Sequence, residues 1–422
     1  VQASSFSYLQ MVLGFIVGQI IIAFVLVPLF YRMNLVSIYE YLENRFGSSS
    51  YKTGAWFFFI SKMLGAAVRL FLVCLTLQLL IFEPFHLPFL LNVILTVFIV
   101  WLYTFRGGVK SLIWTDVLKT FCLVVSVVLC IYYIASSLHL NFNSLVTTLS
   151  DSDFSKTFFF DDVNDKRYFF KQFLAGVIAM NGLDQDMMQR NLSCKNFRDS
   201  QKNMITSGIS QFFVILLFLM LGVLLYTFTA QQGIKNPDKS DEIFPMIATG
   251  NYFPGIVGIL FIIGLIASAY SAAGSALTAL TTSFTVDILN AQKKGEAALS
   301  KIRKHVHIGM AIVMGIIIFV FNLLNNTSVI DAIYTLASYT YGPILGLFAF
   351  GIFTKKQIYD KYIPPIAIAS PVLCYILQRN SEAWFNGYQI SYELLLFNAA
   401  FTFTGLCFLI RKKSTINNTT AL

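Results

Sequence analysis

The sequence predicts an all-α protein that crosses a membrane many times, and three observations predict this fold class. Of the 422 residues, 56% are hydrophobic and only 12% are charged, whereas soluble domains carry about 25% charged residues. The apolar residues are gathered into blocks, most of which reach the roughly 20 residues that cross a bilayer. The 42 Phe and 20 Tyr make the chain too apolar to be disordered.

Eleven apolar blocks are predicted to be transmembrane helices, because each is long, apolar and bounded by polar residues. In chain order they cover residues 8–30, 54–82, 88–105, 111–138, 168–189, 203–229, 254–288, 305–325, 329–352, 362–378 and 392–410. No long linker rich in Pro, Gly or Ser divides the chain. We therefore predict a single transmembrane domain over residues 1–422.

The net charge of +9 is interpreted as a signal of membrane topology. One set of alternate loops holds twenty Lys and Arg residues, and the opposite set holds six. Cytoplasmic loops carry the excess of Lys and Arg, so the C-terminus is expected in the cytoplasm. Because these charges are scattered over short loops, nucleic acid is not an expected partner.

Charged residues inside apolar blocks are candidate functional residues, because each costs about 2.5–3.5 kcal/mol at the centre of a membrane helix. Asp116 lies just inside the fourth block, Lys119 follows one turn later, and Arg69 lies in the middle of the second block. Asp116 either pairs with Lys119 or Arg69 to hold helices together, or supplies negative charge to a cation or proton pathway. Arg69 either pairs structurally or binds an anionic solute.

Hydroxyl side chains in the seventh block recur at steps of three and four residues, which places them on one helix face. They are Ser268, Ser271, Ser275, Thr278 and Thr282. By analogy with calcium and magnesium, the hard cation Na⁺ should prefer oxygen ligands, so this face suits a sodium site. It also suits a packing face of small residues whose hydroxyls bond back to carbonyls, and the block alone favours packing.

Five parts of the chain resemble the sodium/solute symporter family, whose members carry sugars, proline, sialic acid, vitamins and other small solutes. In chain order they are residues 28–47 (PLFYR, then SIYEYLENRFG), 107–116 (GGVKSLIWTD), 184–190 (DQDMMQR), 267–287 (ending FTVD) and 342–348 (GPILGLF). They follow the order of the family over most of the chain.

The resemblance implies a LeuT-type fold, an inverted repeat of five plus five helices with peripheral additions. Residues 1–138 would be the rest of the first repeat, 168–352 the second repeat, and 353–422 peripheral helices with a short tail. The first block matches the second core helix of the family. We therefore expect that the chain is N-terminally truncated and lacks the broken first core helix, which carries half of the sodium site.

The resemblance also implies a general sodium site at Ser268, Ser271 and Ala272. The family often has a second serine where Ala272 stands, so one hydroxyl ligand would be lost here.

A second sodium site, known in the sialic-acid branch of the family, would use Asp116, Ser271, Ser275 and the position of Gly274. Gly274 likewise lacks a hydroxyl. Asp116 and Ser275 have the side chains that this second site requires.

Substrate contacts in that branch include a Phe and a Gln four residues apart at the start of the second core helix, and Phe6 and Gln10 have this spacing. They also include an Arg in the third core helix, which Arg69 could match. Residues 179–181 (AMN) stand where the glucose/galactose branch has aromatic residues, which weakens a sugar interpretation.

We therefore expect a sodium-coupled symporter that imports a small polar organic solute by alternating access, with a carboxylate such as sialic acid favoured by Arg69. The alternatives are a sodium-coupled sugar or polyol symporter and a solute sensor that does not transport. A membrane enzyme is not expected, because the four His residues lie at helix ends or in loops without a metal or nucleophile motif.

No catalytic residue and no cofactor are predicted, and Na⁺ as the coupling ion is the only metal expected. The expected partners are the solute, sodium and the lipid bilayer. We expect a functional monomer in the bacterial cytoplasmic (inner) membrane.

Overall fold

The computed structural model describes residues 4–33, 38–177, 183–192, 194–237, 242–289, 291, 295–324 and 329–411. Within these ranges the side chains of residues 106–115, 185–186, 189–190, 269–270, 287 and 329–334 lie outside the description. Residues 179–181, most of the 107–116 motif and most of the 184–190 motif therefore fall outside the described side chains.

Helices account for nearly all of the described residues, and each of the eleven apolar blocks contains helix, which confirms the all-α prediction. The long helices are α1 (Tyr8–Arg32), α3 (Ser48–Leu77), α4 (Phe89–Ser137), α8 (Phe197–Gln231), α10 (Gly255–Ser283), α11 (Glu296–Leu324), α12 (Val329–Phe353), α13 (Ile363–Trp384) and α14 (Leu394–Phe408). Among the described residues, seven segments are long and apolar enough to cross a membrane, and Phe89–Phe105 and Leu394–Phe408 are shorter apolar helices. The chain is an integral membrane protein.

The third and fourth predicted blocks form one helical run, α4, so the loop expected between them is wrong. No proline interrupts α4, and a helical glycine costs only about 1 kcal/mol, so Gly107 and Gly108 do not end it. The two parts of α4 nevertheless pack on different helices. Thr104 lies 2.9 Å from the His307 ring on α11, whereas Ser126 donates to the Val257 carbonyl on α10 at 3.2 Å.

The fifth predicted block is broken into α6 (Phe169–Val177) and α7 (Gln185–Leu192). The prediction of one helix over residues 168–189 is therefore wrong in detail. Gly176 lies near the end of the described part of α6, at a close crossing with α1, where a Cβ would collide with the Met11 carbonyl oxygen and lie 2.9 Å from the Gly14 Cα. The small residues let the two backbones touch.

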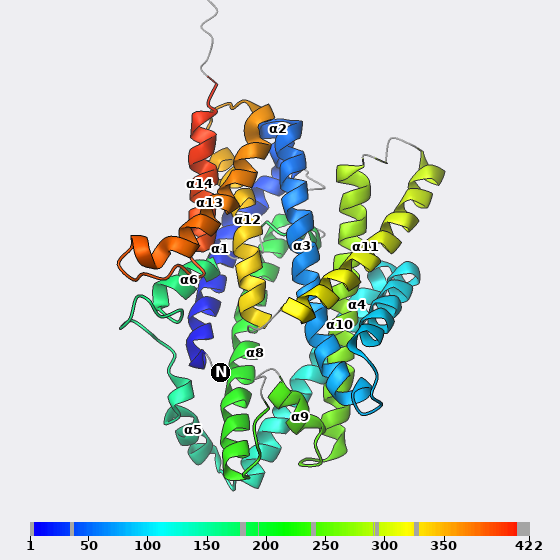
Figure 1. The fold of residues 1–422 in the computed structure, drawn as a ribbon, viewed down its shortest axis with the longest axis vertical. Coiled ribbons are helices and arrows are strands. Elements are labelled where there is room, and N and C mark those ends of the chain that lie inside the picture. Colours follow the sequence, from blue (N-terminus) through cyan, green and yellow to red (C-terminus); the bar gives the residue numbers. More distant parts are fainter. Residues whose placement is uncertain are drawn as a thin grey trace, which may run out of the picture.

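Helix α3 lies between two groups of helices (Figure 1). On one side it packs on α12, which in turn packs on α14 and α13. On the other side it packs on α10 and α11, which both contact α4. The glycine of the 342–348 motif explains one of these contacts, because a Cβ on Gly342 would collide with the Asn398 side chain of α14.

Short elements connect the long helices and were not predicted. They are the helices α2 (Glu40–Arg45), α5 (Phe142–Ser150) and α9 (Ile243–Thr249), the 3₁₀ turns η1 (Ser5–Ser7), η3 (Asp153–Ser155) and η8 (Asp360–Tyr362), and the π turns η2 (Gln78–Phe82) and η6 (Phe284–Ile288). The π turns extend α3 and α10 beyond their last α-helical residues, and such turns are frequent at functional sites. The division of the chain into two repeats stays a prediction.

Candidate functional site

Asp116 and Ser271, two of the predicted sodium ligands, meet where α4 packs on α10. The Ser271 hydroxyl donates a hydrogen bond to Asp116 Oδ1, and the Ser271 side chain is buried, with 3% of its surface exposed. The Lys119 ammonium lies 2.8 Å from the same carboxylate oxygen and 3.5 Å from Ser271 Oγ. The Asp116–Lys119 ion pair considered from the sequence is therefore present.

The other predicted sodium ligands follow Ser271 along α10. Ser268, Ala272 and Ser275 are partly buried. The Ser275 hydroxyl donates to the Ala272 carbonyl oxygen at 3.2 Å, which is the back-bonding expected of a packing face. Thr278 does the same toward the Gly274 carbonyl at 2.8 Å. Their sodium role stays a prediction.

Phe6 and Gln10 lie at the start of α1 beneath the segment that joins α5 to α6. Gln10 is fully buried, and its amide donates to the Arg167 carbonyl at 2.7 Å. Its side-chain oxygen accepts from the Phe159 amide at 3.2 Å. In this structure Gln10 therefore ties α1 to the loop, and its contact with a solute stays a prediction.

Arg69 is exposed on α3. Phe6 belongs to a hydrophobic cluster with α8 and α9, whereas the neighbours of Arg69 along α3 pack against α10 and α11. The described contacts therefore do not bring Arg69 together with Phe6 and Gln10.

A second lysine–carboxylate pair, missed from the sequence, joins α3 to the start of α7. Lys62 Nζ lies 3.0 Å from Asp184 Oδ2, and the two side chains are only 10% and 14% exposed. The Tyr341 hydroxyl donates to the same oxygen at 3.3 Å. Lys62 lies inside the second apolar block, so the signal that singled out Arg69 would also have found it.

A second buried lysine links α6 to the segment before α14. Lys171 is 3% exposed, and its ammonium donates to the Gln389 carbonyl at 2.6 Å. It lies 3.6 Å from Glu393 Oε1 and 4.3 Å from the centre of the Tyr388 ring. Lys171 is thus another charged residue inside an apolar block, and its described partners are all residues of the protein.

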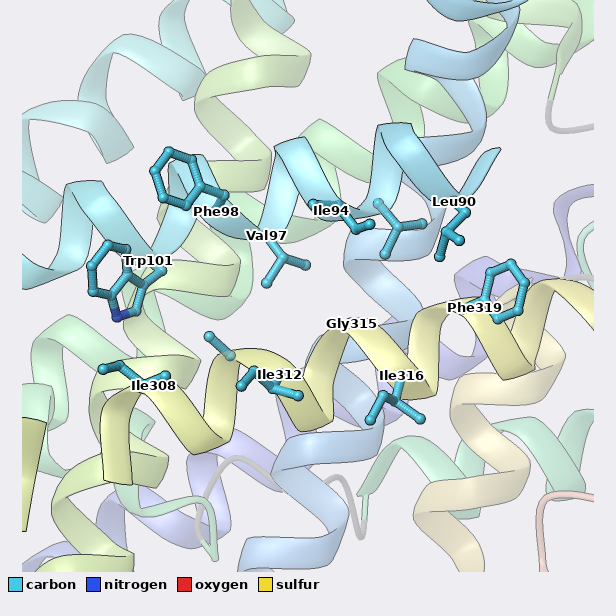
Figure 2. A pocket seen from close by; sticks show the side chains of 12 residues that line it. Leu90, Ile94, Val97, Phe98, Trp101, Ile308, Ile312, Gly315, Ile316 and Phe319 are labelled. Atoms are coloured by element: carbon cyan, nitrogen blue, oxygen red, sulfur yellow. The ribbon is translucent and has the colours of Figure 1, made fainter. Parts of the chain in front are cut away.

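An apolar groove of about 510 Å³ lies between α4 and α11. Figure 2 shows Ile94 and Val97 of α4 across from Ile312 and Ile316 of α11. A binding site for a polar solute needs a few placed polar groups, and the groove offers almost none. Among the described residues no group of three or more His, Cys, Asp or Glu could hold a metal ion.

The sequence profile of the sodium:solute symporter family matches residues 1–359. The chain belongs to the sodium:solute symporter family. This confirms the resemblance found in the five motif segments.

Curated relatives in this family include two bacterial sialic acid transporters. The chain is 26% identical to the sodium/sialic acid symporter NanT of Aliivibrio fischeri over 366 residues, which cover 81% of this chain and 70% of the relative. It is 26% identical to the sodium/sialic acid symporter SiaT of Proteus mirabilis over 360 residues, covering 81% and 71%. The human sodium/iodide cotransporter is 22% identical over 364 residues, covering 82% and 54%.

A solved structure of a Na⁺-coupled sialic acid symporter, in a substrate-bound outward-open state, matches the fold of this symporter-family chain. The TM-score is 0.74 at 21% sequence identity, covering 96% of this chain and 86% of the solved one. The likeness confirms the LeuT-type helical bundle that the motifs implied.

Proposed function

We propose that the chain is a sodium-coupled symporter that takes up a small polar organic solute, and that this solute carries a carboxylate, as sialic acid does. Family membership supports transport coupled to sodium. Two of the relatives are sodium/sialic acid symporters, and Arg69 offers an exposed cation inside a membrane-spanning segment. The loop charges support a C-terminus in the cytoplasm, and the bacterial relatives support placement in the inner membrane.

The observation that carries this proposal is the meeting of Ser271 and Asp116 between two membrane-spanning helices. A hydroxyl has one proton to donate and two lone pairs. Because Ser271 donates its proton to Asp116, its lone pairs point away from the carboxylate and can accept a cation. Ser268, one turn earlier on the same face, and the backbone beside Ala272 would complete the half of a general sodium site that α10 can provide.

A membrane potential supplies about 2.3 kcal/mol per charge for each 100 mV. Each Na⁺ that crosses as net charge therefore supports roughly a 40-fold accumulation of a neutral solute, since about 1.4 kcal/mol is a factor of ten. Arg69 would bind the carboxylate by charge-assisted hydrogen bonds, which are roughly twice as strong as neutral ones.

The test is uptake of labelled sialic acid and labelled sugars into proteoliposomes, with and without an inward Na⁺ gradient. Gradient-driven uptake of the acid alone supports the proposal. Gradient-driven uptake of a neutral sugar alone favours the sugar or polyol alternative. Binding of a solute without any uptake favours a sensor, and uptake that ignores Na⁺ rejects sodium coupling.

Two variants test the residues. Ser271→Ala should raise the half-saturating Na⁺ concentration about tenfold or more, since an interaction with a charged group is worth about 1.5–3 kcal/mol. Thr278→Ala is the matched control, because that hydroxyl bonds only back along α10 among the described contacts. Arg69→Ala should raise the apparent substrate constant for the acid, and an unchanged constant would reject its role.

A further inference from the structure

The position that the sialic-acid branch uses for a second sodium ion holds a different cation in this chain. Asp116 is in place, but its Oδ1 atom receives the Lys119 ammonium at 2.8 Å. The same ammonium reaches Ser271 Oγ at 3.5 Å. Both contacts use the oxygen atoms that a sodium ion would have to share.

The remaining residues of this position also fit sodium poorly. Gly274 offers no side-chain oxygen, and the Ser275 hydroxyl donates to the Ala272 carbonyl at 3.2 Å. A sodium ion beside Asp116 would lie next to a fixed positive charge of the same sign, while the lost hydroxyl removes one of its ligands. The Lys119 ammonium is therefore what excludes a second Na⁺, because the missing hydroxyl at Gly274 removes one ligand but leaves the Asp116 carboxylate and the serine hydroxyls.

The α4 helix itself explains why Lys119 lies here. Residues three apart lie on the same side of a helix, so Lys119 and Asp116 meet on the side that faces α10. Lysine carries a compact ammonium with three N–H donors, so it can donate to the Asp116 carboxylate and to the Ser271 hydroxyl at the same time. The two side chains are 26% and 29% exposed, so the pair is partly shielded from solvent.

We propose that the Lys119 ammonium permanently replaces a second sodium ion at Asp116, so that the protein couples one Na⁺ to each solute. The proposal rests on the proposed function and fixes its stoichiometry. Ser271 keeps a lone pair for the general sodium site, because Lys119 takes one of its two.

A single coupling ion determines the net charge of the transport cycle. One Na⁺ crossing with one singly charged carboxylate carries no net charge, so the membrane potential would neither drive nor retard uptake of the acid. With two Na⁺ the same cycle would carry one positive charge inward, and an inside-negative potential would accelerate it. Lys119 stays on the protein and adds nothing to the charge that is released.

The experiment measures two quantities in proteoliposomes holding wild type or Lys119→Gln: the dependence of acid uptake on Na⁺ concentration, and its response to an inside-negative K⁺ diffusion potential. Wild type should show a first-order Na⁺ dependence and no response to the potential. Lys119→Gln removes the ammonium from the Asp116 carboxylate and should give a cooperative Na⁺ dependence with uptake stimulated by the potential.

Two further variants keep the test decisive if Lys119→Gln folds poorly. Lys119→Arg keeps a cation beside Asp116 and should stay first order in Na⁺. The double variant Asp116→Asn/Lys119→Gln removes both charges and should also stay first order, whatever its rate. Protection of each purified variant against thermal unfolding by Na⁺ alone gives a readout that does not need transport.

The outcomes separate the two proposals. A cooperative Na⁺ dependence in wild type, unchanged in Lys119→Gln, overturns the role of Lys119 and leaves sodium coupling intact. A first-order dependence in every variant, the single Lys119→Gln included, also overturns it. Uptake that does not depend on Na⁺ in wild type rejects the proposed function itself.

Discussion

Two lysine–carboxylate pairs of this protein, Lys119–Asp116 and Lys62–Asp184, differ in how they are connected. Lys119 and Asp116 belong to one helix and are 26% and 29% exposed. Lys62 and Asp184 are 122 positions apart in sequence, join α3 to the start of α7, and are 10% and 14% exposed.

The difference shows how the same two chemical groups can serve different purposes. A pair within one helix needs no particular arrangement of the bundle and moves with its helix, so it can supply a constant charge at an ion site. A pair between two elements exists only while those elements are together. Its charges are more deeply buried, so loss of either partner leaves a charge without compensation.

The largest loss of folding stability is expected from Lys62→Ala. Removing one partner of a buried ion pair costs about 3–5 kcal/mol, because the Asp184 carboxylate stays buried without its cation. The hydrogen bonds to it from the Tyr341 hydroxyl and the Met187 amide, each 3.3 Å long, carry no charge that compensates the loss. Thermal unfolding of the purified protein in detergent measures this loss.

The control for that prediction is the double variant Lys62→Met/Asp184→Leu, which removes both charges and keeps apolar volume. It should recover much of the stability lost in Lys62→Ala, since replacing a buried pair by apolar residues is often neutral or stabilising. Equal losses in the single and double variants would mean that burial of an unpaired charge is not the cause.

A smaller effect is expected from Tyr341→Phe, which removes one hydroxyl and little volume. Its bond to Asp184 Oδ2 is long at 3.3 Å, so we expect a loss of about 1 kcal/mol, the net value of an ordinary hydrogen bond. Thr340 is the neighbouring control, because its hydroxyl donates to Ser61 at 2.8 Å and has no contact with the ion pair. If Thr340→Val and Tyr341→Phe lowered the unfolding temperature equally, the contact between Tyr341 and Asp184 would have no special role in stability.

The pair within α4 should matter less for stability than the pair between α3 and α7. Lys119→Ala is expected to cost about 1 kcal/mol or less, the range of partly exposed pairs within a helix. The same unfolding measurement tests this against Lys62→Ala. If Lys119→Ala lost as much unfolding free energy as Lys62→Ala, the two pairs would not differ in their contribution to stability, and the proposed distinction between them would be wrong.

The sequence offered the Asp116–Lys119 pair as one of its alternatives for Asp116 and missed the Lys62–Asp184 pair, for a physical reason. Asp116 and Lys119 lie within one turn, so helical periodicity alone brings them together. The link from Asp116 to Ser271 came from family motifs. Lys62 and Asp184 meet only through the tertiary fold, which brings α3 to the residue before α7, and no local pattern contains that contact.

Helix boundaries show the same limit. Apolar blocks located every long helix, because crossing a membrane fixes their length and composition. The sequence did not predict that α4 continues through Gly107 and Gly108, or that Leu183 and Asp184 before α7 are not helical. At Gly176 of α6, the contact that requires a glycine comes from the α1 backbone, which is distant in sequence.

The smallest change in folding stability is expected for Asp165, which lies outside the membrane-spanning helices in the loop that contacts Gln10. Burial raises the pKa of Asp165, but hydrogen bonds from the Arg167 side chain and backbone outweigh it, and the pKa is lowered from its usual 3.8. A lowered pKa stabilises the folded state above the usual value, and this contribution is lost as the pH falls through the lowered one. The stability advantage of wild type over Asp165→Asn should therefore be constant at neutral pH, at about 1 kcal/mol or less, and vanish in acid.

Thermal unfolding of both proteins between neutral pH and pH values below 3.8 checks this prediction. Asp161→Asn is the matched control, because Asp161 also pairs with a cation in this loop, Lys156, but is 85% exposed. Its difference from wild type should be close to zero at every pH. Because Arg167 also offers its carbonyl to Gln10, a pH dependence confined to Asp165→Asn would show that the loop over α1 is held by this one carboxylate. A flat difference for Asp165→Asn would leave the loop held by Gln10 and packing alone.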